Sequence, residues 1–336
     1  MTSKRVLAVT NMYPTPRMQD AGTFVEKRVR GLRGLGWEMQ VLLIDRVGKG
    51  MAAYFDAGKQ IRAEVEACRP VLVHVMWGGI LAKQTARQAR GKPLVVSFCG
   101  SDLLGGAFLG SVRRQLARLN VRASHYAARR ADGIIVNAPN LRDALPKDID
   151  AGKVRVIPDP VDLDRFKPLD REACRQTLGW SADAFHVLFP ARPDRKVKRI
   201  YLARAAVEKL RQEGKNVVLH ALPGLPNEEV PVWMNASDAV VLTSLHEGSP
   251  NVIKEALACN RPIVSVDVGD VRERLEGVEG CFLARPDPDD LAVKLRLVEA
   301  GAGVVRGRST VLELSTEQIA ERISAVYRAV LGAKDP

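Results

Sequence analysis

The chain alternates short apolar segments with longer helix-forming stretches along nearly its whole length, and this alternation constrains the fold more than any other feature. A parallel sheet requires such a pattern, because successive parallel strands are joined by helix-length crossovers. The pattern predicts an α/β fold of doubly wound parallel sheets. In the first half we expect strands at Arg5 to Thr10, Glu38 to Ile44, Val71 to Val75, Leu94 to Phe98, Gly133 to Asn137 and Val154 to Pro158. In the second half we expect them at His186 to Ala191, Asn216 to Leu222, Ala239 to Thr243, Pro262 to Val266 and Gly280 to Leu283.

Length and composition fit two such domains and exclude several classes of protein. A chain of 336 residues exceeds what one hydrophobic core usually organises, and an apolar content of 46% argues against wholesale disorder. No apolar run approaches the roughly 20 residues of a membrane helix, and the N-terminus continues into a strand pattern rather than a signal peptide. We therefore expect a cytoplasmic protein. The five cysteines are odd in number and far apart, which argues against a disulfide framework or a structural zinc site.

Residues 238–270 hold the densest chemical information: an apolar strand, a Gly-Ser-Pro turn, a short helix and a second strand. Gly248 allows close approach of the backbone, Ser249 suits a helix cap, and Pro250 suits the first helical position, where no amide donor is needed. The next three amides, of Asn251, Val252 and Ile253, have no partner within a helix and are expected to point at an anion. The segment therefore predicts a phosphate-binding helix N-terminus.

Two carboxylates, Glu247 and Glu255, bracket this turn, and carboxylates accept hydrogen bonds from vicinal hydroxyls. Their spacing, within EGSPNVIKEALACNRPIVS, resembles the E-x7-E signature of glycosyltransferase family 4, the retaining nucleotide-sugar enzymes of the GT-B fold. The resemblance implies that Glu255 binds the ribose hydroxyls of a nucleotide sugar. It assigns the sugar and phosphate end to Glu247, Gly248, Ser249, Pro250, Asn251 and Val252.

Other stretches resemble the same family along nearly the whole chain. VRVIPDPVDLDRFKP is similar to the segment that joins the two family domains, although Asp159 and Pro160 replace its usual Asn-Gly. The resemblance implies two Rossmann-like domains facing each other across a cleft. The acceptor-binding domain would span residues 1–163 and the nucleotide-sugar-binding domain residues 164–315, and a C-terminal helix within 316–336 would return to the first domain.

VLFPARPDRKVKRIYLARA resembles the strand, loop and helix that open the second domain, where an Arg and a Lys grip the donor diphosphate. Arg192 matches the Arg, and it follows a predicted strand, where ligands of parallel sheets bind. Lys198 is our choice for the Lys, but the loop can also be aligned with Lys196 in that place. The Arg fork and the compact Lys charge would together stabilise the leaving diphosphate.

Two segments of the first half also match the family. Gly22 and Thr23, in DAGTFVEKR, occupy its Gly-rich position, which faces the diphosphate. SFCGSDLLG resembles a segment in which a His often precedes Gly-Ser-Asp, but here that position is Cys99. The family His contacts the primary hydroxyl of the donor sugar. Its absence implies either an altered sugar preference or a role taken over by Gly100 and Ser101.

Two further side chains are candidates for functional roles. Asp102 suits the orientation of an acceptor hydroxyl, although an Asp at a strand end caps a following helix about as often. His246, next to Glu247, suits a contact with the donor sugar, and a structural role is at least as well supported.

The base of the nucleotide stays open, because LPGLPNEEVPVWMNASD is shorter than the family usually allows, as if one strand and helix were missing. That region often helps to hold the base. A uridine diphosphate sugar is the commonest donor of the family, and guanosine and adenosine forms are the alternatives.

The basic surplus lies in the N-terminal half. Residues 1–160 contain 26 Lys plus Arg against 13 Asp plus Glu, or +13, and the remainder contains 25 against 26, or −1. A predicted helix from Ser111 to Asp132 concentrates this charge in its arginines 113, 114, 118, 122, 129 and 130, which fall mainly outside an apolar stripe of Val112, Leu116, Leu119, Ala123 and Tyr126. The basic surface suits an anionic membrane, an anionic soluble acceptor or an ordinary solvated face. Nucleic acid is a poorer partner, because aromatics are only 5% of the chain.

The resemblance implies transfer of a hexose or N-acetylhexosamine from a nucleotide-diphosphate sugar to a carbohydrate or lipid-linked acceptor, with retained anomeric configuration, in the synthesis of polysaccharide, glycolipid or glycoconjugate. No carboxylate is an obvious nucleophile, so we expect departure and attack on the same face, aided by orientation and electrostatic stabilisation. We expect no metal or other cofactor, because the sequence has no convincing D-x-D element, and DPDD at 287–290 suits a helix cap.

Rival functions remain. A GT-B sugar-nucleotide epimerase would bind a similar donor, and a transferase could act on a small soluble acceptor. A dinucleotide oxidoreductase would need G-x-G-x-x-G after the first strand, which residues 11–24 lack. A non-catalytic glycan-binding protein is the last alternative, against which the joint presence of Arg192, Glu247 and Glu255 argues.

Overall fold

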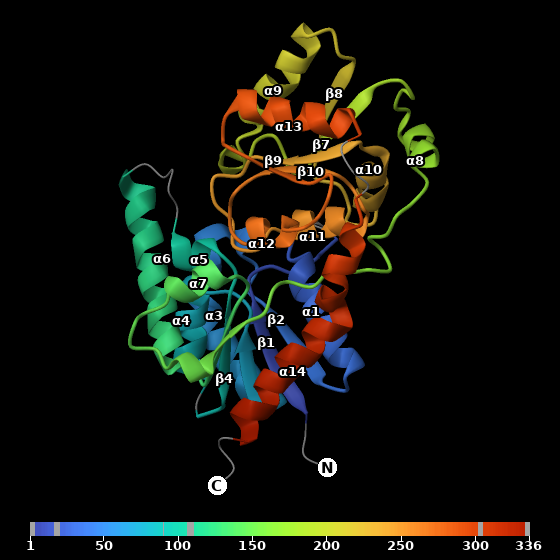
Figure 1. Cartoon of the computed structure of the whole chain (residues 1–336). Coiled ribbons are helices and arrows are strands. Elements are labelled where there is room, and N and C mark those ends of the chain that lie inside the picture. The colour runs from blue at the N-terminus through green and yellow to red at the C-terminus, as the bar shows by residue number, and fades with distance from the viewer. Residues whose placement is uncertain (1–3, 17–20, 90, 106–110, 302–304, 333–336) are drawn as a thin grey trace. The chain divides into compact units, whose positions relative to one another are not determined.

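The structure is a computed structural model that describes residues 4–16, 21–89, 91–105, 111–301 and 305–332 (Figure 1). The chain divides into two compact units. The first unit comprises Met1–Pro160 and Thr316–Pro336, and the second unit comprises Val161–Ser315. Each unit contains one parallel sheet, which confirms the predicted α/β fold of two Rossmann-like domains.

The sheet of the first unit has the strand order β2-β1-β3-β4-β5-β6, and all of its neighbouring strands are parallel. Its strands are β1 (Arg5–Thr10), β2 (Glu38–Leu43), β3 (Leu72–Val75), β4 (Leu94–Phe98), β5 (Gly133–Val136) and β6 (Val154–Val156). Its described helices are α1 (Thr23–Gly34), α2 (Arg46–Lys49), η1 (Gly50–Ala52), α3 (Ala53–Cys68), α4 (Gly79–Gln88), α5 (Ser101–Leu104), α6 (Ser111–Arg130), α7 (Pro139–Asp143), η2 (Ala151–Lys153) and α14 (Thr316–Gly332).

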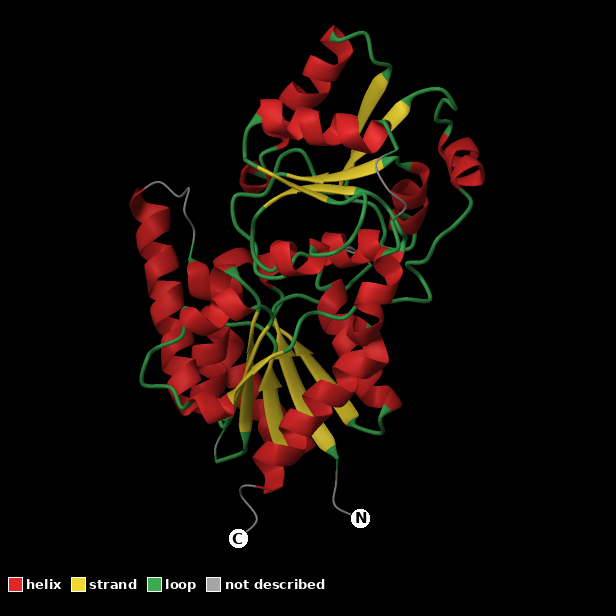
Figure 2. Ribbon diagram, in the orientation of Figure 1, coloured by secondary structure: helices red, strands yellow, loops and turns green. Residues whose placement is uncertain are grey.

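Helices cover both faces of this sheet (Figure 2). On one face, Val9 of β1 and Val75 of β3 pack in a single buried cluster with Ile61 of α3, Leu81 of α4 and Ala127 of α6. Successive side chains of a strand point to opposite faces, so the neighbouring strand residues are available for the helices α1 and α14 on the other face. The central strands are therefore apolar on both sides, as a doubly wound sheet requires.

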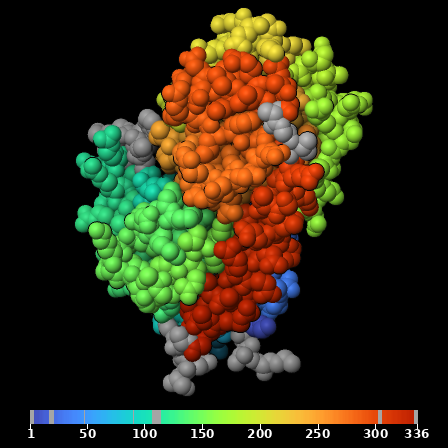
Figure 3. All heavy atoms as spheres, viewed as in Figure 1, coloured from blue at the N-terminus to red at the C-terminus, as the bar shows by residue number. Residues whose placement is uncertain are grey.

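A buried polar network connects the C-terminal helix to the first sheet. The ring of His74 in β3 lies with Nδ1 2.6 Å from the Tyr327 hydroxyl of α14 and with Nε2 2.7 Å from Ser97 Oγ of β4. Trp37 Nε1 donates to Ser324 Oγ of the same helix at 2.8 Å. Burial lowers the pKa of His74 well below its ordinary value, so this imidazole stays neutral. Helix α14 thus belongs to the first unit, and Figure 3 shows its outer side at the surface in red.

The departure from the family's Asn-Gly at Asp159 has a structural counterpart in α1. Asp159 Oδ1 lies 2.9 Å from Arg28 Nη2, and both side chains are nearly inaccessible to water. Asn137 Nδ2 also donates to Asp159 Oδ2 at 3.1 Å. A buried guanidinium requires a carboxylate partner, so the buried Arg28 accounts for an Asp at position 159.

The sheet of the second unit has the strand order β11-β10-β9-β7-β8, again with parallel neighbours. Its strands are β7 (Phe185–Phe189), β8 (Val217–Ala221), β9 (Ala239–Leu242), β10 (Ile263–Val266) and β11 (Phe282–Ala284). Its described helices are α8 (Arg171–Leu178), η3 (Lys196–Lys198), α9 (Ile200–Gln212), α10 (Val230–Ala236), α11 (Asn251–Ala258), α12 (Val271–Leu275), α13 (Pro288–Glu299) and η4 (Gly307–Leu314). Strand β8 forms one edge of this sheet and leads through a loop directly into α10.

An aromatic cluster covers part of that edge strand. The Trp180 ring stacks on His220 of β8 with 3.6 Å between centroids, and Trp233 of α10 meets Trp180 edge-on. His186 Nε2 lies 2.8 Å from the Ser181 carbonyl and must donate to it, so its Nδ1 accepts from His220 Nε2 at 2.8 Å. Burial, with a smaller contribution from His186, lowers the pKa of His220 to about 4.

The apolar stripe predicted for helix α6 is only partly correct. Ala123 is buried and Tyr126 is half-buried, but Leu116 and Leu119 are 53% and 56% exposed. The side chains of Val112 and Arg113 lie outside the described residues. Among the residues of α6 from Arg114 onward, the buried ones begin at Ala123, so this stretch before Ala123 runs past the core that the C-terminal half covers. Within the described ranges, no helix has the length and apolar character to cross a membrane.

Candidate functional site

The loop between β9 and α11 forms the predicted phosphate-binding turn. Helix α11 begins at Asn251, and Pro250 is its N-cap residue with a φ of −68°. The prediction placed Pro250 one position further into the helix. The amide of Ile253 donates to the Pro250 carbonyl at 3.1 Å, so it is not among the free amides, as we had predicted. The amides of Asn251 and Val252 remain the ones that face out of the first turn.

Ser249 does not cap the helix as predicted. The N-cap position belongs to Pro250, and the Ser249 hydroxyl donates to Asp270 Oδ2 at 2.8 Å. The Asp270 amide donates to the Gly248 carbonyl at 3.1 Å. A Cβ on Gly269, which has a φ of +62°, would lie 1.9 Å from that same carbonyl oxygen. The segment after β10 therefore holds the Gly248–Ser249 turn in place.

Two of the predicted side chains form an ion pair. Lys198 Nζ lies 2.5 Å from Glu247 Oε1, and the two side chains are 18% and 19% exposed. Lys198 ends η3 and Glu247 lies in the loop after β9, so the pair joins two segments that follow different strands of the same sheet. Lys196, the alternative lysine, is exposed. Of the two alignments of the basic loop, the geometry favours the one that selects Lys198.

Arg199 explains why Lys198 reaches Glu247. Its guanidinium donates to the carbonyls of Thr243 and Ser244 at 2.7 and 2.9 Å, and the Leu245 amide donates to the Val197 carbonyl at 2.9 Å. Arg199 has a φ of +51°, an unusual conformation for a residue with a side chain. These contacts fasten η3 to the loop after β9. Sequence reasoning missed this role of Arg199, which looks like one more cation in a basic loop.

Arg192 lies at the end of β7, beyond Ala191, as predicted. Its guanidinium pairs with Asp194 through Nη2 at 3.0 Å and Nε at 3.3 Å, and both side chains are more than half exposed. Its aliphatic stem packs beside Gly224, where a Cβ would lie 3.3 Å from Arg192 Cδ. The structure thus brings Lys198 and Glu247 together and gives Arg192 a separate, exposed partner.

Two buried oxygens in this loop have unused hydrogen-bonding capacity. Ser244 Oγ and Asn251 Oδ1 are shielded from solvent and have no hydrogen-bond partner within the described part of the chain. Glu255 and His246 are half-buried, and Glu255 lies one turn after Asn251 on α11. Buried polar atoms are normally paired, so the two oxygens indicate a place for ligand hydroxyls or water.

The predicted residues of the first unit lie in two loops. Gly22 precedes α1 with a φ of +71°, and a Cβ there would lie 2.4 Å from the Met12 carbonyl, so only glycine fits. Thr23 is the first residue of α1, and Gly22 is its N-cap residue. The Gly22 carbonyl accepts a hydrogen bond from the Val25 amide at 2.9 Å, which closes this turn.

Asp102 organises the second loop from within. Its carboxylate accepts the amides of Gly78 at 3.0 Å, Cys99 at 3.1 Å and Gly100 at 2.8 Å, and the residue is 1% exposed. Burial raises the pKa of Asp102 above its ordinary value, and the backbone amides oppose that rise. Asp102 does not cap a following helix, because it lies within α5, whose N-cap residue is Gly100, and its carboxylate instead binds amides that precede it in the chain. Cys99 is half-buried, and Ser101, at the start of α5, is exposed.

Among the described residues, no group of three or more His, Cys, Asp or Glu side chains is arranged so that it could hold a metal ion. At the predicted phosphate site, Lys198 and the amino end of α11 supply positive charge.

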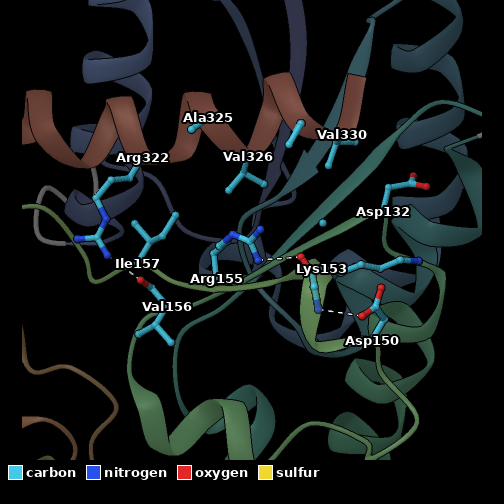
Figure 4. A pocket seen from close by; sticks show the side chains of 13 residues that line it. Asp132, Asp150, Lys153, Arg155, Val156, Ile157, Arg322, Ala325, Val326 and Val330 are labelled. Carbon is cyan, nitrogen blue, oxygen red and sulfur yellow. Dashed lines mark hydrogen bonds between the residues drawn. The ribbon is translucent and has the colours of Figure 1, made fainter. Parts of the chain in front are cut away.

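The first unit contains a cavity of about 690 Å³ under α14, at the β6 edge of its sheet (Figure 4). Two of its three cations bind backbone carbonyls: Arg322 donates to Val156 O and Arg155 donates to Gly152 O, each at 2.7 Å, and Lys153 is the third. None of the predicted site residues lines it. This cavity is therefore a feature of the sheet edge and not of the predicted site.

Two protein families match the chain, one in each half. The family described as "Glycosyltransferase Family 4" matches residues 21–165, and the family described as "Glycosyl transferases group 1" matches residues 191–299. The second match contains Arg192, Lys198, Glu247 and Glu255.

Curated relatives carry glycosyltransferase names. D-inositol 3-phosphate glycosyltransferase 1 of Catenulispora acidiphila is 26% identical over 302 residues, which cover 78% of this chain and 72% of that protein. The putative teichuronic acid biosynthesis glycosyltransferase TuaC of Bacillus subtilis is 23% identical over 80% of this chain and 82% of its own length. The D-inositol 3-phosphate glycosyltransferase of Geodermatophilus obscurus is 30% identical over 54% of this chain and 48% of its own length.

Solved structures share the fold. The sucrose-phosphate synthase of Thermosynechococcus elongatus superposes with a TM-score of 0.81 at 19% identity, covering 98% of this chain and 100% of that one. Anabaena HepE, solved with UDP and glucose, superposes with a TM-score of 0.69 at 16% identity, covering 96% and 99%. At these identities the likeness concerns the fold.

Proposed function

Because the chain belongs to family 4 of the group 1 glycosyltransferases, we propose that its second unit binds a nucleotide-diphosphate sugar and that its first unit binds the acceptor hydroxyl to which the sugar is transferred. The observation that carries the proposal is the Lys198–Glu247 pair beside the amino end of α11. It sets a cation, a carboxylate and two helix amides in one loop region, which suits a ligand with both phosphates and hydroxyls.

Each part of the site has a role in this proposal. Lys198 and the amides of Asn251 and Val252 neutralise the diphosphate as negative charge builds on it. Glu255 accepts the ribose hydroxyls, and Glu247 accepts a hydroxyl of the sugar. Arg192 exchanges Asp194 for phosphate oxygens, because its fork binds two oxygens of either group and its exposure leaves it free to move.

The transfer retains the anomeric configuration in this proposal. The bond from the anomeric carbon to the leaving phosphate oxygen breaks, and the acceptor oxygen attacks from the same face through an oxocarbenium-like state. The leaving phosphate oxygen takes the proton of the acceptor hydroxyl. Asp102 is a poor general base here, because backbone amides already occupy its carboxylate. Orientation and electrostatics therefore carry the catalysis, without a metal ion.

The proposed donor is a UDP sugar carrying a hexose or N-acetylhexosamine, in agreement with the UDP bound to Anabaena HepE. The proposed products are cell-envelope polysaccharides, glycolipids or glycoconjugates, since one relative is named for teichuronic acid biosynthesis. The basic surplus of the first 160 residues fits an enzyme that works at the inner face of an anionic membrane.

A thermal-shift panel tests the proposal. Uridine, guanosine and adenosine diphosphates and their sugars are added in turn with a chelator, and the matching nucleotide raises the melting temperature. Product analysis with the best donor alone then separates the rival epimerase, which converts the donor without an acceptor. A panel without any shift contradicts the proposed donor site.

A further inference from the structure

Asp270 follows β10 and occupies the N-cap position of α12, but its side chain makes no capping hydrogen bond to that helix. Two other aspartates of the second unit do cap their helices. Asp170 accepts the Ala173 amide at the start of α8. Asp287 accepts the Asp290 amide at the start of α13. An N-cap carboxylate normally takes such a bond, because the first amides of a helix have no other partner, so Asp270 is diverted from the role that its position favours.

The Asp270 carboxylate points instead at the Gly248–Ser249 turn. Its Oδ2 accepts the Ser249 hydroxyl at 2.8 Å and Arg274 Nε at 3.1 Å, and the residue is buried. Arg274 lies one turn further on, in α12, so it holds the carboxylate from the opposite side. A hydroxyl has a single proton to donate, and Ser249 gives it to Asp270. The Ser249 side chain is therefore anchored to the protein and has no proton left for a ligand.

A second bond from Asp270 fixes the direction of the Gly248–Ser249 peptide. The Asp270 amide donates to the Gly248 carbonyl at 3.1 Å, and Gly269 packs against the same carbonyl oxygen. The peptide bond is trans, so its N–H points opposite to its C=O. The Ser249 amide therefore points away from the segment after β10. Among the described residues, this amide has no hydrogen-bond partner.

Along the chain, the Ser249 amide lies between the two parts of the proposed donor site. Glu247, two residues earlier, is the proposed acceptor of a sugar hydroxyl, and Asn251, two residues later, presents its amide to phosphate. Pro250 has no amide to contribute. A hydroxyl that donates its proton to a carboxylate still has lone pairs, which an adjacent N–H can satisfy. An amide at this place suits the same sugar hydroxyl that Glu247 accepts.

We propose that Asp270 is a positioning residue for sugar transfer, which clamps the Gly248–Ser249 peptide through its own amide and carboxylate so that the Ser249 amide faces the donor sugar. The inference rests on the proposed function, because it concerns the same donor site. It adds to that site a residue of the loop after β10 that acts through Ser249. The clamp therefore governs the binding of the sugar and leaves that of the nucleoside diphosphate unchanged.

Calorimetric titration of the full chain with UDP and with UDP-glucose tests the inference. Ser249→Ala and Asp270→Ala each release the turn, because each removes the bond between the two side chains. Each lowers the affinity for UDP-glucose about tenfold, as expected when one well-placed hydrogen bond is lost, and leaves the affinity for UDP within about twofold of the parent value. Asp270→Asn keeps an oxygen that accepts the Ser249 hydroxyl, so it loses less affinity for UDP-glucose than Asp270→Ala does.

The double variant of Ser249→Ala with Asp270→Ala separates a clamp from two independent effects. It binds UDP-glucose no more weakly than either single variant, because both changes remove the same bond. Asp267→Ala is the matched control, since Asp267 lies three residues earlier in the same loop, is exposed and pairs with Arg272. It leaves both affinities unchanged. Ser249→Ala removes a single oxygen atom, so it keeps the test decisive if Asp270→Ala does not fold.

Equal losses of affinity for UDP and UDP-glucose in the single variants would mean a general loss of structure and would overturn the inference. Additive losses in the double variant, or unchanged binding of UDP-glucose in both single variants, would do the same. In each of these cases the parent protein still binds UDP, so the proposed function stands. A parent protein that binds neither UDP nor UDP-glucose contradicts the proposed UDP-sugar donor itself.

Discussion

Lys198 Nζ and Glu247 Oε1 lie 2.5 Å apart, so a cation and a carboxylate from two loops of one sheet form a single pair. Partly buried ion pairs add little to stability after desolvation. The pair instead presents a positive group and a hydroxyl acceptor side by side, next to the amino end of α11. That combination fits a sugar diphosphate better than either residue does alone.

Replacing Lys198 tests which lysine acts on the diphosphate. Lys198→Ala lowers turnover about a hundredfold or more, as expected for a charge that stabilises the leaving group. Lys196→Ala, which removes an exposed charge of the same loop, changes turnover by at most about fivefold. Steady-state rates at saturating donor compare the two variants. Equal losses would show that the loop acts as a general basic surface.

Arg192 should matter more for turnover than for donor affinity. The Arg192–Asp194 pair must open before the guanidinium reaches phosphate, so its full interaction develops late, as the diphosphate leaves. Arg192→Ala therefore lowers kcat by a larger factor than it raises the Kd of the donor. Arg285→Ala, at a 77% exposed arginine of the same unit, is the control and leaves both unchanged. A change in Kd alone would assign Arg192 to ground-state binding.

Gly269 should be more sensitive to substitution than another glycine of the same unit. Gly269→Ala places a Cβ 1.9 Å from the Gly248 carbonyl oxygen at positive φ, so it costs about 2–4 kcal/mol and displaces the phosphate turn. Gly277→Ala has a similar φ of +70° but open space, and costs about 1 kcal/mol. Urea unfolding of both variants measures the difference. Similar costs would mean that the turn moves aside freely.

The free energy of unfolding should decrease as the pH is lowered, and His220 should account for part of this decrease. Its folded-state pKa of about 4 lies below the ordinary 6.5, so the unfolded chain binds the proton first as the pH falls. This contribution is complete above about pH 6.5 and is lost as the pH falls towards 4. Melting temperatures of His220→Gln between pH 7 and pH 5 therefore fall less steeply than those of the parent. His125→Gln serves as the control, and identical slopes in all three proteins would contradict the account.

The sheets could be predicted because their strands are continuous apolar runs bounded by turn residues. Strands β1 and β4 have the predicted limits of Arg5–Thr10 and Leu94–Phe98. The other strands shift by one or two residues at one or both ends. Strand β7 stops at Phe189 because Pro190 has no amide for the ladder, and β11 starts after Gly280, whose φ is +75°.

The site could be predicted only where neighbouring residues define it. The helix at Asn251 and the carboxylates around it follow from local sequence, but the partner of Ser249 is Asp270, 21 residues further on. Leu116 and Leu119 show the same limit on α6. Helical spacing marks an apolar stripe, and it does not reveal where the helix runs past the core.

Titration calorimetry of the best nucleotide sugar against the parent and Glu255→Ala tests the central claim most directly, because Glu255 alone is assigned to the ribose. The account predicts saturable binding by the parent, without metal, and an affinity about tenfold or more lower in Glu255→Ala, as expected for hydrogen bonds to a charged group. Glu279→Ala, at an exposed glutamate of the same unit, should bind like the parent. Equal affinities in all three proteins would contradict a donor site at the amino end of α11.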